Sequence, residues 1–377
     1  MKLDIRGAGP AGAFLALRAA ARGWSVTLRD PACVFPDAHC STTNIALPDW
    51  PATYGVLEPD VPVWAEDFCT PAHPLRVIAE QEHVLDFGYR MLDKASVREA
   101  VQTLVDAGRV ELTADLSGDA GVVVDCTGAP KDPATLWQVA VGYVLPEGCG
   151  VDEAVFMDWR GEDREMASFV YIQPVEEGWL VEETILSGPG ADDVIMRELE
   201  RRLVDRLLDM GVASDVVESP LSVERVRIPM NSRSGVFNRP DKQGRVYFGG
   251  AGGLINPATG YSVGASMSAA DQFLDMLADE RGSRGDSWGW RTALAYFLRS
   301  MGGVLIARAD QVTLRSFFEN FFRLPAERQV AYLLGHDGVA VARTMWELRK
   351  NAGWRHSFLQ PLWHQPLTTV RESLRGL

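Results

Sequence analysis

A glycine-rich turn near the N-terminus has the spacing that binds the phosphates of a dinucleotide. It consists of Gly7, Ala8, Gly9, Pro10, Ala11 and Gly12. In this pattern the first glycine permits a tight turn, the second lets backbone N–H groups approach a pyrophosphate, and the third allows close packing of helix on strand. The positive end of the following helix then faces the phosphates. Asp30 ends the next apolar run, where a carboxylate can accept a hydrogen bond from a ribose hydroxyl.

The segments around this turn agree with that interpretation. Residues 3–5 predict a strand, 13–23 a helix and 25–28 a second strand, which together make a βαβ unit. Pro10, directly after the second glycine, is typical of the large FAD-binding flavoproteins rather than of NAD dehydrogenases. The sequence therefore predicts an FAD site built on the N-terminal segment.

Two later turns are candidates for contact with the rest of the flavin nucleotide. The valine-rich run at 121–127 predicts a strand that ends in a turn, and an ordinary strand–turn explains the same residues. The run at 245–248 predicts another strand, followed by a glycine loop and a helix of small residues at 263–270. We expect cofactor contacts from Asp125, Gly128, Gly249, Gly250, Ala251, Gly252, Gly260 and Tyr261.

The middle of the chain predicts a second, antiparallel sheet. Runs at 154–157, 169–173 and 179–184 are separated by short turns, and residues 191–211 predict an amphipathic helix. We therefore expect an α/β protein with a Rossmann-type FAD-binding domain, like the glutathione-reductase- and hydroxylase-like flavoproteins. The expected division assigns 1–45, 85–150 and 240–280 to the FAD-binding domain, 46–84 and 151–239 to an antiparallel-sheet substrate domain, and 281–377 to a helical C-terminal region.

Composition and charge exclude several classes of protein. The chain has 377 residues, 46% of them hydrophobic, and a formal net charge of −14. The hydrophobic content is that of a globular protein, and the acidic surplus argues against nucleic acid as a partner. No apolar run reaches the ~20 residues of a membrane-spanning helix. The six histidines lack metal-ligand spacing, so we expect no metal.

The N-terminus and the cysteines predict where the protein resides. The first residues lead directly into the glycine turn without the cleavage site of a signal peptide. The five cysteines, including Cys40, are scattered and odd in number, which predicts buried thiols in a reducing compartment. We therefore expect a cytoplasmic protein.

The C-terminal region differs from the rest of the chain in charge. Residues 281–377 hold twice as many basic as acidic residues. The same region contains the aromatic residues Trp288, Trp290, Phe297, Phe317, Phe318, Phe321, Phe322, Trp346, Trp354 and Trp363. Basic, aromatic-rich helices can bind an anionic membrane surface, and a solvated helical cap over the core is the alternative.

Four segments, taken in order along the chain, resemble the FAD-dependent lycopene cyclases of plants and bacteria. They are Trp-Pro-Ala-Thr-Tyr-Gly-Val at 50–56, Phe-Met-Asp-Trp-Arg at 156–160, Leu-Val-Glu-Glu-Thr at 180–184, and Arg-Ile-Pro-Met at 227–230 with the later glycine loop and Pro-Ala-Thr-Gly-Tyr at 257–261. The family also carries glycine at the position of Gly250, where hydroxylases usually carry aspartate. It usually has histidine where this chain has Asn256.

The resemblance implies cyclisation of the ends of a linear carotenoid, lycopene to β-carotene, without net electron transfer. A proton is delivered to a terminal C=C, the next alkene attacks the tertiary carbocation, and loss of a proton sets the final double bond. Such a site needs a carboxylic acid that stays protonated near neutrality, which burial and nearby negative charge favour. By resemblance Glu182 is this acid and Glu183 the second candidate. Neighbours on a strand point to opposite faces, so only one of them can face the cavity, and plain surface charge is the alternative.

Other residues of these segments are further candidates for the site. Asp158 could supply a second carboxylate, with a structural pair to Arg160 as the alternative. Trp50, Tyr54 and Trp159 could bind the substrate and stabilise a cation through their π faces, and packing in the core is the alternative for each.

The resemblance also implies FAD that acts in its reduced form, with NAD(P)H as an indirect source of electrons. Because a C40 hydrocarbon resides in the bilayer, we expect a polyene substrate and a peripheral protein on the inner face of the cell membrane. The alternatives are an FAD-dependent monooxygenase, a reductase of isoprenoid double bonds, a cyclase of a non-carotenoid terpenoid, which Asn256 would permit, and a flavin-binding protein without catalysis.

Overall fold

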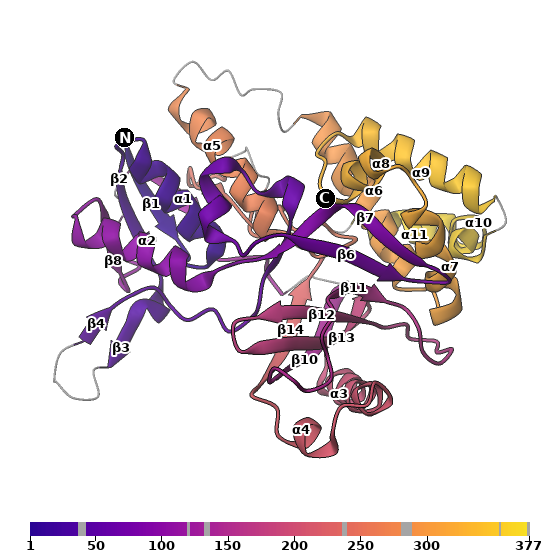
Figure 1. The fold of residues 1–377 in the computed structure, drawn as a ribbon. Coiled ribbons are helices and arrows are strands. Elements are labelled where there is room, and N and C mark those ends of the chain that lie inside the picture. The colour runs from indigo at the N-terminus through magenta and orange to yellow at the C-terminus, as the bar shows by residue number, and fades with distance from the viewer. Residues whose placement is uncertain are drawn as a thin grey trace.

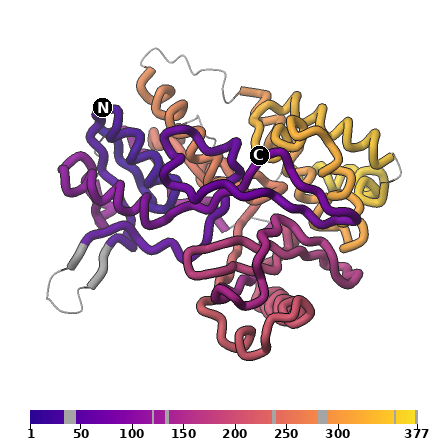
Figure 2. The backbone as a smooth tube through the Cα atoms, viewed as in Figure 1, coloured from indigo at the N-terminus to yellow at the C-terminus, as the bar shows by residue number. Residues whose placement is uncertain are grey.

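The computed structural model describes residues 1–36, 43–118, 121–131, 136–235, 240–279, 289–353 and 356–374. Figure 1 shows the N-terminal elements in indigo at one end of the molecule and the C-terminal helices in gold and yellow at the other. A second sheet lies between and below them, and the backbone trace in Figure 2 shows the same arrangement. The expected fold class is confirmed: two different sheets are combined with a helical C-terminal region.

A five-stranded parallel sheet forms the nucleotide-binding part. Its strand order is β15 (Val246–Tyr247), β9 (Val122–Asp125), β1 (Lys2–Arg6), β2 (Ser25–Arg29) and β8 (Val110–Thr113). The sheet packs with helices α1 (Pro10–Ala21), α2 (Lys94–Asp106) and α5 (Val263–Ala278). Leu3, Ile5, Leu28 and Val124 are fully or almost fully buried, as expected for parallel strands with both faces covered. The predicted βαβ unit is therefore present.

An eight-stranded sheet forms the second part. Its order is β14 (Ser222–Pro229), β10 (Trp137–Leu145), β13 (Gly178–Gly188), β12 (Phe169–Val175), β11 (Val155–Asp158), β6 (His73–Ile78), β7 (Glu82–Met91) and β5 (Gly55–Leu57). The pairs are antiparallel except for β11 with β6. Helices α3 (Asp193–Asp209) and α4 (Ser214–Glu218) cover one face of this sheet and lie below it in Figure 1. The side chain of Asp192 begins α3 by accepting the N–H groups of Val194 and Ile195.

The strands do not divide between the two sheets as the predicted ranges would have them. β10 falls inside 85–150, the range assigned to the FAD-binding domain, and most of β7 does, yet both belong to the eight-stranded sheet. β8 and β9 from the same range belong to the parallel sheet. The chain therefore crosses from the eight-stranded sheet to the parallel sheet after β7, and crosses back before β10. A short hairpin of β3 (Val34–Pro36) and β4 (Thr43–Ile45) stands apart.

The C-terminal region is helical, as predicted. It contains α6 (Trp290–Ile306), α7 (Gln311–Phe322), α8 (Ala326–Leu333), α9 (Gly338–Ala352), α10 (Gln360–His364) and α11 (Pro366–Ser373). Phe317, Phe318, Phe321 and Phe322 of α7 are buried in a core shared with the second sheet, so these four aromatics are not part of a surface. Trp290, Trp346 and Trp363 are exposed, whereas Trp288 and Trp354 lie outside the described residues. Within the described ranges, no helix has the length and apolar character of a membrane-spanning segment.

The cysteines in the described ranges carry free thiols. Cys33, Cys126 and Cys149 are buried as predicted, whereas Cys69 is half-buried. Cys40 lies outside the described residues.

Candidate active site

The three predicted flavin-binding turns meet at one edge of the parallel sheet. The turns follow β1, β9 and β15, which are adjacent in the sheet, so their carboxyl ends lie side by side. An added Cβ on Gly250 would lie 3.0 Å from the amide nitrogen of Ala129, and one on Gly249 would lie 2.5 Å from the Cβ of Ala11. Residues that are far apart in sequence therefore form a single glycine-lined site, at the edge where parallel sheets bind nucleotides.

The individual glycines show where the chain is close-packed and where it leaves room. A Cβ on Gly12 would lie 2.0 Å from the carbonyl oxygen of Gly7, and one on Gly7 would lie 2.6 Å from Cys126. A Cβ on Gly9 or Gly128 would meet no atom within 4 Å. The first pair thus fixes the turn against the sheet, and the second pair leaves space for a ligand. This arrangement of tight and open positions fits the phosphate-binding part of a flavin nucleotide.

The carboxylates of the predicted site hold the turns in place. Asp30 accepts the backbone N–H of Ala8 at 2.9 Å, so it lies beside the glycine turn at the end of β2. Asp125 accepts the backbone N–H and the hydroxyl of Thr127 at 3.0 and 2.7 Å. Gly260 has a φ of +78°, and a Cβ there would lie 2.0 Å from Gln138 Oε1. This last position allows only glycine without rearrangement.

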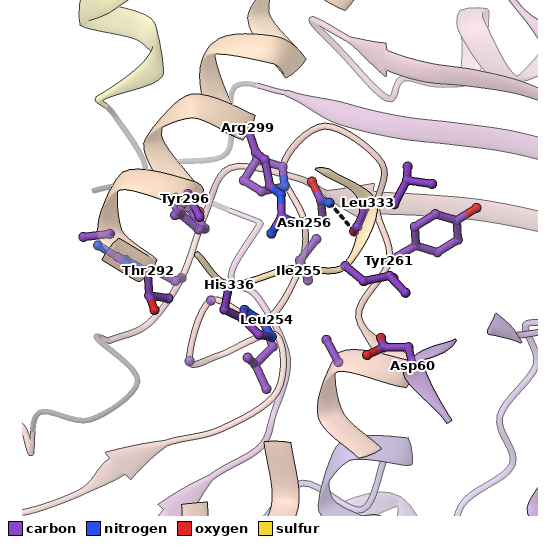
Figure 3. A pocket seen from close by; sticks show the side chains of 18 of the residues that line it. Asp60, Leu254, Ile255, Asn256, Tyr261, Thr292, Tyr296, Arg299, Leu333 and His336 are labelled. Atoms are coloured by element: carbon purple, nitrogen blue, oxygen red, sulfur yellow. Dashed lines mark hydrogen bonds between the residues drawn. The ribbon is translucent and has the colours of Figure 1, made fainter. Parts of the chain in front are cut away.

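A cavity of about 420 Å³ lies beside the glycine loop, between that loop and α6 (Figure 3). Asn256 lines it, and its amide donates to the Leu333 carbonyl at 2.9 Å while its oxygen accepts the N–H of Ala258 at 3.0 Å. Arg299 also lines it, and its guanidinium donates to the Tyr332 carbonyl at 2.8 Å. Asn256, at the position where the family usually has histidine, therefore ties the glycine loop to the end of α8.

The two neighbouring glutamates face opposite sides of the second sheet. Glu183 is fully buried and faces α3, where Arg206 Nε donates to it at 2.9 Å and the Ser168 hydroxyl also donates. Glu182 faces the other side, where the Thr184 hydroxyl donates to it at 3.0 Å. Glu183 thus belongs to a structural ion pair, and only Glu182 faces the side of the sheet on which Tyr171 and Tyr261 lie.

Glu182 lies against a group of aromatic residues that we call the tyrosine cluster, consisting of Tyr89, Phe156, Tyr171 and Tyr261. Tyr171 is the cross-strand partner of Glu182, and the Tyr261 hydroxyl hydrogen-bonds to Tyr171. The Phe156 ring lies 5.3 Å from Tyr89 and 5.6 Å from Tyr171, centroid to centroid. Because Tyr261 directly follows Gly260, this cluster connects the glycine-lined site to Glu182.

The surroundings of Glu182 favour its protonated form. Burial raises the pKa of the Glu182 carboxyl to about 7, and the negative charge of Glu224 adds to that rise. The hydrogen bond from Thr184 acts in the opposite direction. A carboxyl group with this pKa is protonated in a substantial fraction of the molecules at neutral pH and can donate its proton.

Three of the predicted site residues have structural roles instead. Asp158 accepts the backbone N–H of Arg160 at 2.9 Å and its guanidinium at 2.7 Å, so the alternative of a structural pair is correct. Trp159 is fully buried and stacks on Phe318 at 4.6 Å, which makes it part of the core. The Trp50 indole donates to the carbonyl of Ala8 at 3.0 Å, so it supports the glycine turn. The side chain of each of these three residues is bonded to or packed on its neighbours and does not face a cavity.

Glu224 is a residue near the site that the sequence analysis missed. It lies on β14 and is half-buried, and Thr53 donates to both of its oxygens. Tyr54, a predicted substrate-binding residue, is half-buried, and the negative charge of Glu224 contributes to its raised pKa after burial. The alternation of 222–228, with Glu224, Val226 and Ile228 on one face, is the signal that would have placed Glu224 on the inner side of a strand.

Comparison with solved structures defines the class of fold. The probable FAD-dependent monooxygenase PqsL from Pseudomonas aeruginosa has a TM-score of 0.51 at 16% identity, over 81% of this chain and 95% of that one. A mutant of 2-methyl-3-hydroxypyridine-5-carboxylic acid oxygenase has a TM-score of 0.53 at 13% identity, over 93% of this chain and 98% of that one. The protein therefore has the fold of the FAD-dependent monooxygenases.

Comparison of sequences defines the family within that fold. The model of the lycopene cyclase protein family matches residues 3–336, and the chain belongs to this family. An uncharacterized carotenoid cyclase of Deinococcus radiodurans is 29% identical over 93% of this chain and 90% of its own length. The lycopene beta cyclase of an Oncidium hybrid is 25% identical over 86% and 75%, and that of Synechococcus elongatus is 26% identical over 57% of each. The match to the Narcissus pseudonarcissus enzyme spans 46% of that protein.

Proposed function

We propose that this protein is a flavin-dependent carotenoid cyclase in which Glu182 donates the proton that starts ring closure. The observation that carries the proposal is the position of Glu182 on the second sheet, against the tyrosine cluster, where the pKa of its carboxyl is raised to about 7. Membership in the lycopene cyclase family supplies the class of substrate, a linear polyene such as lycopene. Glu182 is the acid, and Glu183 on the opposite face is not.

The steps of the reaction balance without a net change in the protein. The Glu182 carboxyl transfers its proton to the terminal C=C, which leaves a tertiary carbocation on the polyene. The π electrons of the next alkene close a six-membered ring, and a ring proton then leaves to restore the double bond and the acid. The rings of Tyr89, Phe156, Tyr171 and Tyr261 pack against one another on the side of the sheet that Glu182 faces, and their π faces would stabilise a cation and exclude water.

The end of the polyene has a place to bind beside the tyrosine cluster. A small apolar cavity of about 30 Å³ is lined by Phe156, Tyr171 and Tyr261, together with Phe317 and Tyr332 of the C-terminal helices. A second apolar cavity of about 50 Å³, lined by Leu362 and Arg349, shares Phe317 and Tyr332 with the first. We infer that these helices part to admit the chain, because neither cavity holds a long hydrocarbon in the present arrangement.

The glycine-lined site fits FAD. Gly9 and Gly128 would face the pyrophosphate, and Asp30 would accept from the ribose beside the first turn. When bound in its reduced form, FAD would supply negative charge that stabilises the carbocation without accepting electrons. NAD(P)H is the proposed indirect source of the electrons that reduce it.

We propose that the protein binds peripherally to the inner face of the cell membrane, and the exposed tryptophans support this proposal. The tryptophan face, as we call it, comprises Trp346, Trp363, Leu367 and Arg349. The two indoles are 51% and 57% exposed, Leu367 is 85% exposed, and the Arg349 guanidinium lies 5.6 and 5.4 Å from the two indole rings. Arg349 also lines the second apolar cavity, so the tryptophan face adjoins the route proposed for the polyene.

Anaerobic turnover tests the proposed reaction. The purified protein, loaded with FAD and reduced with dithionite, is incubated with lycopene in anionic vesicles, and the product is analysed by mass spectrometry and absorption. We expect a product of unchanged mass with the shortened chromophore of a cyclised end. A product heavier by one oxygen would identify a monooxygenase, and one heavier by two hydrogens an isoprenoid reductase. Lycopene that remains unchanged, while a non-carotenoid terpenoid is cyclised, would redefine the substrate.

A further inference from the structure

Glu182 and Glu224 face the same side of the sheet, on either side of a strand position that has no side chain. In the register of the sheet, Gly142 on the intervening β10 pairs with Glu182 on β13 and with Glu224 on β14. A Cβ added to Gly142 would lie 2.8 Å from Cδ1 of Leu180 and 3.3 Å from the Cβ of Glu182. Gly142 therefore places no side chain of its own between Glu182 and Glu224, and the end of the Leu180 side chain reaches into that space.

Glu224 is held in place by a segment that is distant in sequence. The backbone N–H of Thr53 donates to one of its oxygens at 3.1 Å, and the Thr53 hydroxyl donates to the other. Donors to both oxygens fix the orientation of this carboxyl group. Thr53 belongs to the segment 50–56, which is also fixed to the glycine turn through Trp50.

Titratable groups that act on Glu182 come from three other strands, with Tyr171 on β12, Glu224 on β14 and Tyr89 on β7. Tyr261, before α5, hydrogen-bonds to Tyr171. Arg225 points to the opposite face, where it donates to Glu200 of α3 at 2.7 Å. Arg206 on that face pairs with Glu183. These two arginines are thus bound to other carboxylates, on the far side of the sheet.

We propose that Glu224 is a positioning residue whose fixed carboxylate, acting across Gly142, keeps the carboxyl of Glu182 protonated. This inference rests on the proposed function, since it assigns Glu182 as the proton donor. Two negative charges on the same face of a sheet repel, so the charge of Glu224 opposes ionisation of Glu182 across the intervening β10. Thr53 holds Glu224 in this position with two hydrogen bonds.

The test compares Glu224→Gln with Glu200→Gln, which removes the same charge from the opposite face of the sheet. The protonated carboxyl of Glu182 is followed by its infrared C=O band in the FAD-loaded protein without substrate, as a difference from Glu182→Gln across a pH series. We expect Glu224→Gln to move the titration of Glu182 to lower pH by about one unit, from Coulomb repulsion across two strand spacings at an effective dielectric constant near 20. Glu200→Gln and the charge-retaining Glu224→Asp should leave it within a few tenths of a unit.

Turnover gives a second readout that a merely structural role would not move. In Glu224→Gln, kcat should approach the wild-type value at pH 6 and fall roughly tenfold below it at pH 8, since the alkaline limb moves with the titration. An unchanged infrared titration, or an equal loss of kcat at every pH, would overturn the proposal. If Glu224→Gln does not fold, Thr53→Val must still shift the band toward lower pH, and failure to do so has the same force. A shifted titration in a protein that does not cyclise lycopene would refute the proposed function and leave the coupling intact.

Discussion

The opposite orientation of Glu182 and Glu183 leads to contrasting outcomes for two matched substitutions. Glu182→Gln keeps the shape and the Thr184 hydrogen bond but removes the transferable proton, so kcat should fall at least ~100-fold. Its free energy of unfolding should change by less than ~1 kcal/mol, because the side chain is half-buried and uncharged when protonated.

Glu183→Gln should behave in the reverse manner. Glu183 is fully buried, and Arg206 loses its ionic partner while its own side chain is 18% exposed. Removing one member of a buried pair costs about 3–5 kcal/mol, and partial exposure of Arg206 reduces this to about 2–3 kcal/mol. For a chain of this size we expect the midpoint of thermal unfolding to fall by roughly 3–4 °C, with the activity per folded molecule unchanged within a factor of about three.

Both variants are measured by thermal unfolding with FAD bound and by anaerobic turnover of lycopene at matched fractions folded. The reasoning is refuted if Glu183→Gln abolishes turnover at an unchanged midpoint. It is equally refuted if Glu182→Gln retains turnover, because the orientation of the two side chains then carries no chemical meaning.

Three further predictions follow from the site and the C-terminal helices. Because the pKa of Glu182 is raised from 4.5 to about 7, its protonated fraction, and with it kcat, should fall as the pH rises through about 7. Gly12→Val should abolish FAD binding, measured by the flavin absorbance of the purified protein, since a Cβ there would lie 2.0 Å from the Gly7 carbonyl oxygen. Replacing Trp346 and Trp363 together by Ser should lower the fraction that sediments with anionic vesicles about tenfold, from loss of two indoles.

Each of these predictions has an outcome that contradicts it. An alkaline limb that persists at pH 7 in Glu182→Gln would assign the titration to another group. A fully loaded Gly12→Val protein would show that the turn does not hold the nucleotide. Leu208→Ser, which removes an exposed apolar side chain from α3, is the control for vesicle binding and should leave it unchanged.

Local patterns were sufficient to predict the nucleotide-binding elements. The glycine spacing at 7–12 and the apolar runs beside it depend on neighbours in sequence, and β1, α1 and β2 lie close to the predicted ranges. The two-residue period of a strand predicts that only one of Glu182 and Glu183 can face the cavity. Which one could not be derived, because it depends on which face α3 covers.

The pair of Asp158 with Arg160 could be foreseen as an alternative because the two residues are neighbours in the sequence. Partners that come from distant segments could not be predicted, as for Trp159, which stacks on Phe318 of α7 in the folded chain. Glu224 became part of the site only through the register of β14 on β10 and through Thr53. A glycine such as Gly142 gives no sign in the sequence that it separates two carboxyls.

The segment 50–56 joins two parts of the molecule that perform different tasks. Trp50 fastens it to the glycine turn after β1, Thr53 fastens it to β14, and Lys94 donates to the carbonyls of Trp50 and Ala52 between them. These seven consecutive residues thereby link the glycine turn to Glu224 over a fixed length of chain. A deletion or insertion within this segment would disturb its contacts with the glycine turn and with β14 at the same time. A chimeric protein would therefore need residues 50–56 from the same parent as the two sheets that they connect.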